Sequence, residues 1–339
     1  MGSCMGHRVF LVGCLLLCFG AQSLSAQDGG VSVLAPEPLY DREVQAYISY
    51  GLTSKTGLKT GDSKARNPSD LFLQQHRIGL GLNYALPNAG KPGDTIHTLT
   101  RDWTVSIFQP FLYKDYRTSA SGKVFGDQFA EPGDFALLFR RRWLWWAAND
   151  LSGRALHISA VAGIEFPTGN SSLKSDDVRL PRSLQPGKGS HSVILANIFG
   201  WEADMFEAFA TSIYRWRSIG SPDYDFGDSF SQEFKVAYRI VQDPYPGQSM
   251  SPNVGIRYQV STPTKLNGNK LENSGSREII LRPGVIWHVF AYDEAVDGGL
   301  DINFSAAIPL YQDVNGTQAV TQFSLQVSVA LRFTTLFDD

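Results

Sequence analysis

The sequence predicts an all-β fold, an antiparallel up-and-down transmembrane β-barrel of about twelve strands. Beyond residue 43, stretches of roughly ten residues alternate apolar and polar side chains, as strands that cross a bilayer do. Each stretch ends in a break rich in Gly, Pro, Asn or Asp, the residues of turns and loops. The chain also opens with the features of an export signal.

The N-terminus is typical of a secretory signal peptide. Arg8 precedes the apolar run VFLVGCLLLCF, which is too short to cross a bilayer as a helix, and small residues follow up to Ala26. We therefore predict a signal peptide over 1–26, a short periplasmic segment over 27–43 and a barrel over 44–337. Leu17 is too large for the usual lipid-attachment box, so we expect no lipid anchor at Cys18.

Composition excludes several classes of protein. All three cysteines lie in the predicted signal peptide, so the mature chain has no disulfide framework, thiolate nucleophile or cysteine metal site. Acidic residues slightly outnumber basic ones, 33 against 30 in the whole chain, which gives no electrostatic footprint for nucleic acid. An exported domain without disulfides needs another source of stability, and a closed barrel in a membrane supplies one.

The strands follow from apolar residues at every second position. The expected outward-facing stretches are 44–52, 78–86, 103–107, 135–145, 156–166, 191–201, 206–216, 230–240, 254–260, 279–289, 302–310 and 323–333. The third is disturbed at Pro110, which cannot donate to a ladder. Arg141 falls on the outward face, so it either snorkels to an interface or marks a bulge.

The breaks between the strands differ in length. With both termini in the periplasm, the outer loops are 53–70, 114–133, 167–188, 219–228, 263–276 and 312–319, and the turns are 87–102, 148–154, 202–205, 242–252 and 292–299. Most outer loops are long and two turns are very short, as in bacterial barrels, although 87–102 is longer than a periplasmic turn should be.

Aromatic residues gather at the predicted periplasmic ends of the strands. This girdle comprises Trp143, Trp145, Trp146, Phe199, Trp201, Trp287, Phe290, Tyr292, Phe333 and Phe337. Aromatic rings favour the membrane interface. A soluble β-sandwich or jelly roll would also alternate, but it does not explain aromatics at matching ends.

The polar face of the strands would line the lumen. The candidates for a solute path are Arg77, Arg140, Arg142, Glu165, Lys235, Arg239, Arg257, Arg282 and Arg332. Two interpretations stay open. These side chains pair across the lumen and plug it, or they form an arginine-lined constriction that favours anions, such as aromatic acids or phenolates.

Catalytic and cofactor sites are weakly supported. His157 and Ser159 share one strand face, which would suit an outer-membrane lipid hydrolase, but that face is turned to the lumen and direct contact at this spacing is not assured. The loop acids lack calcium-loop spacing, and no nucleotide, haem or zinc motif is present. We predict no catalytic residue, no metal and no cofactor.

Three stretches resemble one family. They are GDFALLFRRRWL (133–144), AVAGIEFPTGNSS (160–172) and LQPGKGSHSV (184–193), with a Gly-Asp strand opening, a Pro-Thr-Gly strand end and a Gly-x-Gly-Ser strand opening. In this order they resemble the outer-membrane barrels named for the MetA pathway of phenol degradation. The resemblance covers roughly 130–337 and implies a transporter-like barrel associated with aromatic-compound uptake; it implies no catalytic residue.

The sequence thus predicts passive, porin-like passage of small, aromatic or anionic compounds across the outer membrane. The alternatives are a plugged structural or surface-interaction barrel that acts through its outer loops and, third, a lipid hydrolase. The expected partners are outer-membrane lipid, small-molecule solutes and the barrel-assembly machinery, with no nucleic acid.

Overall fold

The structure is a computed structural model that describes residues 39, 43–67, 70–87, 102–120, 123–147, 154–175, 178–180, 184–220, 224–242, 248–289 and 298–334. The predicted signal peptide (1–26) lies outside these residues, as does the predicted periplasmic segment (27–43) apart from Leu39 and Glu43. Phe290, Tyr292 and Phe337 of the predicted girdle also lie outside them.

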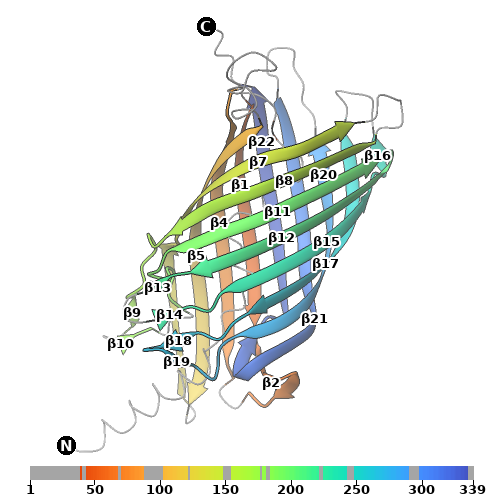
Figure 1. Cartoon of the computed structure of the whole chain (residues 1–339). Helices are drawn as coiled ribbons and strands as arrows, with labels where there is room; N and C mark the ends of the chain where they lie inside the picture. The colour runs from red at the N-terminus through yellow and green to blue at the C-terminus, as the bar shows by residue number, and fades with distance from the viewer. Residues whose placement is uncertain are drawn as a thin grey trace, which may run out of the picture.

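Twelve antiparallel strands close into a barrel within the described chain, which confirms the predicted fold class (Figure 1). In ring order they are β1 (Glu43–Lys55), β4 (Phe72–Ala85), β5 (Trp103–Ala120), β7 (Phe135–Ala147), β8 (Ala155–Phe166), β11 (Ser192–Ala203), β12 (Phe206–Arg217), β15 (Ser229–Tyr238), β17 (Ser249–Ser261), β20 (Ser276–Val289), β21 (Gly298–Val320) and β22 (Phe323–Thr334). Ring order follows chain order, and β22 closes the ring on β1 with Val329 opposite Ile48.

The two ends of the barrel differ. One end, here the turn end, carries Glu43 and Thr334 and lies at the top of Figure 1, where the C-terminus is marked. The other, the loop end, carries most of the short strands: β2 (Gly57–Gly61), β3 (Ser63–Ala65), β9 (Lys174–Ser175), β10 (Val178–Arg179), β13 (Ile219–Gly220), β14 (Tyr224–Asp225), β18 (Lys265–Leu266) and β19 (Asn269–Lys270). A further short strand, β16 (Val241–Gln242), pairs with the start of β17 at the turn end.

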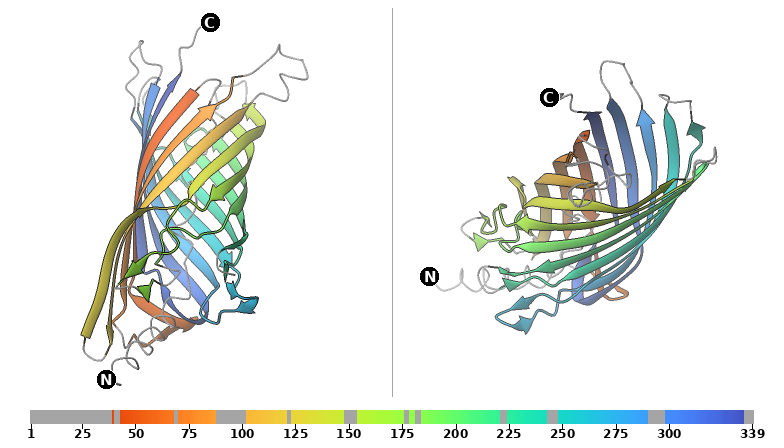
Figure 2. Two further views of the ribbon diagram at one scale, coloured as in Figure 1. Left: turned by 90° about the vertical axis from the view of Figure 1, so that its left-hand side faces the viewer. Right: turned by 45° about the horizontal axis from the view of Figure 1, so that its top comes forward.

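The interval 114–133 is not the loop that the sequence predicts. β5 runs on to Ala120 and pairs with β6 (Lys123–Pro132), so this hairpin extends the wall beyond the other strands at the loop end (Figure 2). Pro110 does not interrupt β5, because it stands between the last β7 partner and the first β6 partner, at the point where no ladder donor is needed. The predicted loop 53–70 likewise contains the β2–β3 hairpin.

The outer surface is a band of apolar side chains. Every second residue is exposed along the strands, for example Ile78, Leu80 and Leu82 on β4. Among the most exposed are Phe234 at 62%, Leu310 at 59% and Val236 at 55%. A soluble fold would bury such residues, so this continuous apolar exterior is that of a barrel surrounded by lipid.

A bulge in β7 corrects one part of the predicted alternation. The register with β8 shifts between Arg142 and Leu144, so Leu144 and Trp146 become exposed. The backbone of Trp145 pairs opposite His157, and its predicted outward facing stays a prediction. Arg141 lies on the outer side, where its guanidinium stacks over Trp103 at 5.5 Å and Trp143 at 4.6 Å. The predicted bulge and the aromatic interface are therefore both present.

The aromatic girdle lies at the turn end. The exposed members are Trp143, Trp146, Phe199, Trp201 and Phe333. Trp146 and Trp201 both pair with Leu156 from opposite sides, so they lie at one level of the wall. Among the described residues, no helix is long and apolar enough to span a membrane.

The interior contains apolar packing as well as charge. Leu138, Val161, Ile194, Ile198 and Ile213 form one buried cluster on the inner faces of β7, β8, β11 and β12. The inner face is therefore less uniformly polar than the sequence predicts.

Candidate functional site

The nine predicted lining residues fall on inward positions of the alternation, in distinct groups along the barrel. Glu165 lies toward the loop end, and Arg140 lies in the middle of β7, opposite Thr104 and Val161. Arg257, Arg282 and Lys235 lie together in the middle. Arg142, Arg239 and Arg332 lie near the turn end, and Arg77 lies on the β4 wall.

The middle group is here called the mid-lumen cluster: Glu233, Lys235, Arg257 and Arg282. Arg257 donates from Nε and Nη2 to Glu233 Oε2, at 2.9 and 2.6 Å, and Arg282 Nη1 donates to the same oxygen at 2.8 Å. Lys235 Nζ lies 3.9 Å from Glu233 Oε1. One carboxylate therefore faces three cations, and the cluster carries an excess of positive charge.

Gly255 makes the mid-lumen cluster possible. Glu233 is on β15 and Arg282 is on β20, with β17 between them. Gly255 is the inward residue of β17 that pairs with Arg282 on one side and Lys235 on the other. A Cβ there would lie 3.3 Å from Glu233 Oε1, tighter than ordinary contact. The missing side chain lets the two charged groups meet across the intervening strand.

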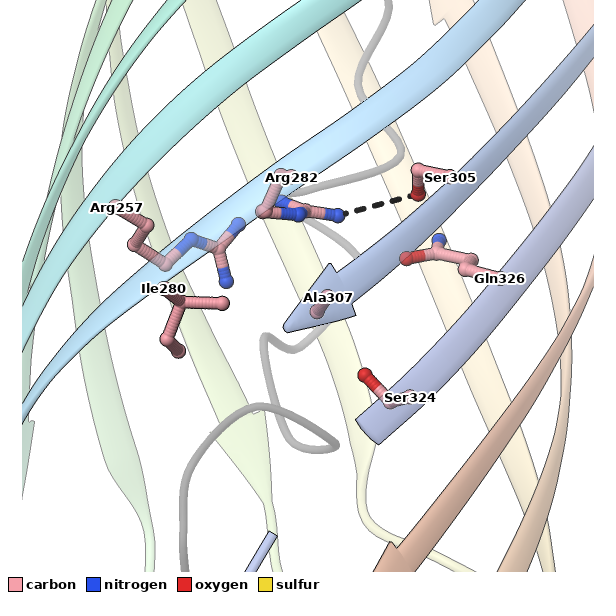
Figure 3. Close-up of a pocket in the computed structure, with 7 residues that line it drawn as sticks. All are labelled: Arg257, Ile280, Arg282, Ser305, Ala307, Ser324 and Gln326. Carbon is pink, nitrogen blue, oxygen red and sulfur yellow. Dashed lines mark hydrogen bonds between the residues drawn. The ribbon is translucent and has the colours of Figure 1, made fainter. Parts of the chain in front are cut away.

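A pocket opens beside this cluster (Figure 3). It is lined by Arg257, Ile280, Arg282, Ser305, Ala307, Ser324 and Gln326, which come from β17, β20, β21 and β22. Arg282 Nη2 also reaches Ser305 Oγ at 3.4 Å. The pocket combines guanidinium groups, neutral hydrogen-bonding groups and a small apolar floor of Ile280 and Ala307.

At the loop end, a segment between β8 and β11 turns into the barrel. Lys188 lies in the interval predicted as an outer loop, yet its Nζ is 2.6 Å from Glu165 Oε2, and the two side chains are only 4% and 6% exposed. Arg215 Nε lies 4.0 Å from the same carboxylate oxygen. Lys114 Nζ, from β5, donates to the carbonyl oxygen of Gln185 at 3.1 Å.

Asp134 fixes the same segment. Its Oδ1 accepts from the backbone N–H of Gly169 at 3.0 Å, and its Oδ2 accepts from that of Lys188 at 2.9 Å. Gly187 packs directly on Gly169, where a Cβ on Gly187 would lie 2.1 Å from the Gly169 carbonyl oxygen. We name Asp134, Glu165, Gly169, Gly187 and Lys188 the latch. The three stretches that carry the family resemblance meet in it.

An apolar cluster lies at the loop end. It contains Leu58, Leu71, Leu73, Tyr116, Leu180, Leu184 and Ala319. Leu180 and Leu184 come from the segment held by the latch, whereas the others come from β2, β4, β5, β21 and the approach to β4. The segment therefore reaches across the loop-end mouth toward the opposite wall.

Burial sets the protonation of two latch residues that lie outside the strands. It raises the pKa of Asp134 to about 6, against the opposing effect of the Lys188 charge. Burial also lowers the pKa of Lys188 to about 8, although the Glu165 carboxylate acts in the other direction.

The turn-end residues form local ion pairs. Arg332 Nε donates to Asp301 Oδ2 at 2.9 Å, and His288 Nδ1 lies 2.6 Å from Asp301 Oδ1. Arg239 Nη2 donates to Glu207 Oε1 at 2.5 Å. Arg142 pairs with Asp102. In these pairs each acid is matched by a base, so they add less net charge than the mid-lumen cluster.

Arg77 lies against an aromatic pair on the opposite wall. Its guanidinium is 4.9 Å from the ring of Phe108, which stacks with Tyr47 at 6.2 Å. Both rings lie over glycines of β4, since a Cβ on Gly79 or Gly81 would collide with Phe108 or Tyr47 respectively. These aromatics narrow the lumen from this side.

His157 and Ser159 have packing roles. Both are fully buried on the inner face, as the alternation predicts. The His157 ring covers Gly200, where a Cβ would lie 2.0 Å from the ring, and Arg140 donates to Ser159 Oγ at 3.2 Å. Within the residues that the structure describes, no group of three or more His, Cys, Asp or Glu side chains could hold a metal ion.

The sequence did not single out Lys188, Asp134 or Gly255 as parts of a site. The sequence places Lys188 in an outer loop, because the alternation of side chains in strands does not predict the path of a loop. Asp134 and Gly169 lie in two of the stretches that resemble the family, and this resemblance is the sequence feature that could have indicated the latch. Gly255 is one glycine among many in the strands.

The closed ring, the apolar exterior and the charged interior define a membrane-spanning β-barrel. Its fold is similar to that of a crystal structure of an outer-membrane channel from Pseudomonas putida F1, with a TM-score of 0.61 and 16% identity, over 88% of this chain and 98% of that one. At this identity the likeness shows the shared fold.

Two autotransporter barrels are more distant. The transport unit of AIDA-I from Escherichia coli has a TM-score of 0.47 and 8% identity, over 91% of this chain and 95% of that one. The translocator domain of NalP from Neisseria meningitidis has a TM-score of 0.41 and 8% identity, over 98% and 97%. No family model matches the sequence, and no curated protein matches it.

Proposed function

We propose that this protein is an outer-membrane channel for the passive passage of small solutes, with a preference for anions. The observation that carries the proposal is the mid-lumen cluster, in which one carboxylate faces three cations inside the barrel. Arginine and lysine groups that line a narrow path favour anions over cations. The shared fold with an outer-membrane channel supports the location.

The lipid-facing band and the turn-end aromatics support a place in the bacterial outer membrane, with the turn end in the periplasm. Insertion there would require export by the predicted signal peptide and the barrel-assembly machinery. Only the resemblance to the phenol-degradation family suggests that the solutes are aromatic. Fractionation of cells, together with the heat-modifiable gel mobility of a folded barrel, tests the location; a soluble, heat-insensitive protein would overturn it.

Proteoliposome swelling tests the transport itself. We expect faster swelling with sodium benzoate than with benzylammonium chloride, each compared with protein-free liposomes. The two organic ions have nearly the same size and opposite charge. A sodium-carrying ionophore in the benzoate arm lets the counter-ion enter with benzoate, so the comparison reports the charge of the organic ion. Equal rates would reject the anion preference, and no swelling with either would reject the channel.

The latch favours a second candidate, a barrel closed at its loop end. The Glu165–Lys188 pair and the apolar cluster around Leu184 hold the segment inside the mouth. In this case the protein would act as a structural or surface-interaction barrel. Absence of conductance that persists after the latch is broken would favour this function over transport.

A further inference from the structure

We propose that the pocket beside the mid-lumen cluster is a binding site for a small organic carboxylate, with Arg282 as the group that receives the carboxylate. This inference rests on the proposed function and deepens it, because it names the chemical class of the solute and the residue that recognises it.

The first observation is the positive charge of the site, which favours an anionic ligand. Arg257 and Arg282 line the pocket and both contact the Glu233 carboxylate, with Lys235 as a third cation 3.9 Å from that carboxylate. A buried excess of positive charge is costly, and an incoming anion reduces this cost. Guanidinium groups bind carboxylates through parallel hydrogen bonds, which favours a carboxylate over a spherical anion.

The second observation is the orientation of the Arg282 guanidinium, which is held in place by Glu233. Its Nη1 donates to Glu233 Oε2 at 2.8 Å, whereas its Nη2 is directed to Ser305, on the pocket side, at a long 3.4 Å (Figure 3). The contact with Glu233 fixes the plane of the guanidinium, so the side chain is held in place before a ligand arrives. Such preorganisation reduces the entropy cost of binding.

The remaining lining defines the rest of the ligand. Ser305, Ser324 and Gln326 supply hydrogen-bonding groups on one side. Ile280 and Ala307 supply an apolar surface beside the guanidiniums. The pocket holds only about 20 Å³, room for the carboxylate group, so the short apolar body of the ligand would extend beyond it along Ile280 and Ala307. A dication would match neither part.

Binding of benzoate to the detergent-purified full-length barrel tests the inference by isothermal titration calorimetry. We expect saturable binding of benzoate and no measurable binding of benzamide, which has nearly the same shape without the charge. Arg282→Gln should weaken benzoate binding at least about tenfold, since a hydrogen bond to a charged group is lost. The matched control is Arg277→Gln, because Arg277 lies on the same strand with an exposed side chain.

A second variant gives the opposite expectation. Glu233→Gln removes the carboxylate that competes for the arginines, so benzoate should bind more tightly, by about tenfold. A merely structural role for the cluster would not produce this gain. Equal binding of benzoate and benzamide, or unchanged benzoate binding in both Arg282→Gln and Glu233→Gln, would overturn the inference.

The test also separates this inference from the proposed function. Benzoate that binds but does not cross liposomes would leave the site intact and reject the channel. Anion-selective swelling without saturable binding would leave the channel intact and reject the site.

Discussion

Replacing Lys188 with methionine should release the segment that closes the loop-end mouth. Lys188→Met keeps an unbranched side chain of similar length and removes only the charge. Glu165 would then remain buried, with Arg215 Nε 4.0 Å from its carboxylate. The barrel itself should stay folded, because its strands pair independently of this contact.

The geometry sets the size of the effect. At an effective dielectric constant of about 20, the 2.6 Å pair with Lys188 is worth roughly 6 kcal/mol and the 4.0 Å pair with Arg215 roughly 4 kcal/mol. Removing one partner of a buried pair costs about 3–5 kcal/mol. Because Arg215 still offsets part of the charge of Glu165, we expect about 3 kcal/mol, or a roughly 100-fold larger open population.

Amide hydrogen exchange, read by mass spectrometry, measures this population. The informative amides are Gly169 and Lys188, which donate to Asp134, and Gly187, which donates to the Asn170 carbonyl oxygen. They should exchange up to about 100-fold faster in Lys188→Met. The matched control is Lys174→Met, since Lys174 lies in the same segment with its side chain exposed. Equal exchange in the two variants would refute the reasoning.

Three further outcomes are expected. Asp134 takes up a proton near pH 6 in the closed segment but near 3.8 when open, so closure weakens as pH rises between these values. Exchange protection of the segment, corrected for intrinsic rates, should therefore fall as the pH rises from about 4 to about 6; a flat profile over this range would contradict this. Gly187→Ala should expose the segment to limited proteolysis, because its Cβ would lie 2.1 Å from the Gly169 carbonyl oxygen, at a cost of about 1–3 kcal/mol; wild-type resistance would argue against the close packing. Gly255→Val should abolish benzoate binding while heat-modifiable mobility persists, since bulk at this position separates the mid-lumen cluster; intact binding would show that the cluster tolerates a side chain there.

The alternation of side chains was sufficient to predict the barrel. Strand periodicity is a local property, and lipid outside requires it on every strand, so stretches such as 156–166 and 206–216 gave both location and facing correctly. Alternation failed where strand pairing, rather than periodicity, determines the structure. The β5–β6 hairpin has no lipid-facing requirement beyond the membrane, and the shift in β7 exposes Leu144 and Trp146 because a bulge reverses the facing of the residues after it.

The sequence predicted which residues face the interior of the barrel, but not which of them contact one another. Alternation placed Arg257 and Arg282 inside the barrel, but their shared contact with Glu233 depends on strand register and on the open space at Gly255. The inward course of Lys188 depends on a loop, and loops carry no alternation. The plugged and the open interpretations both remain predictions, which the conductance measurements distinguish.

The preference for anions is tested most directly by the reversal potential of the purified barrel in a planar bilayer under a KCl gradient. We expect a reversal potential of the sign set by chloride, which moves toward zero in Arg282→Gln and is unchanged in Arg277→Gln. A reversal potential at zero, or of the sign set by potassium, would contradict it.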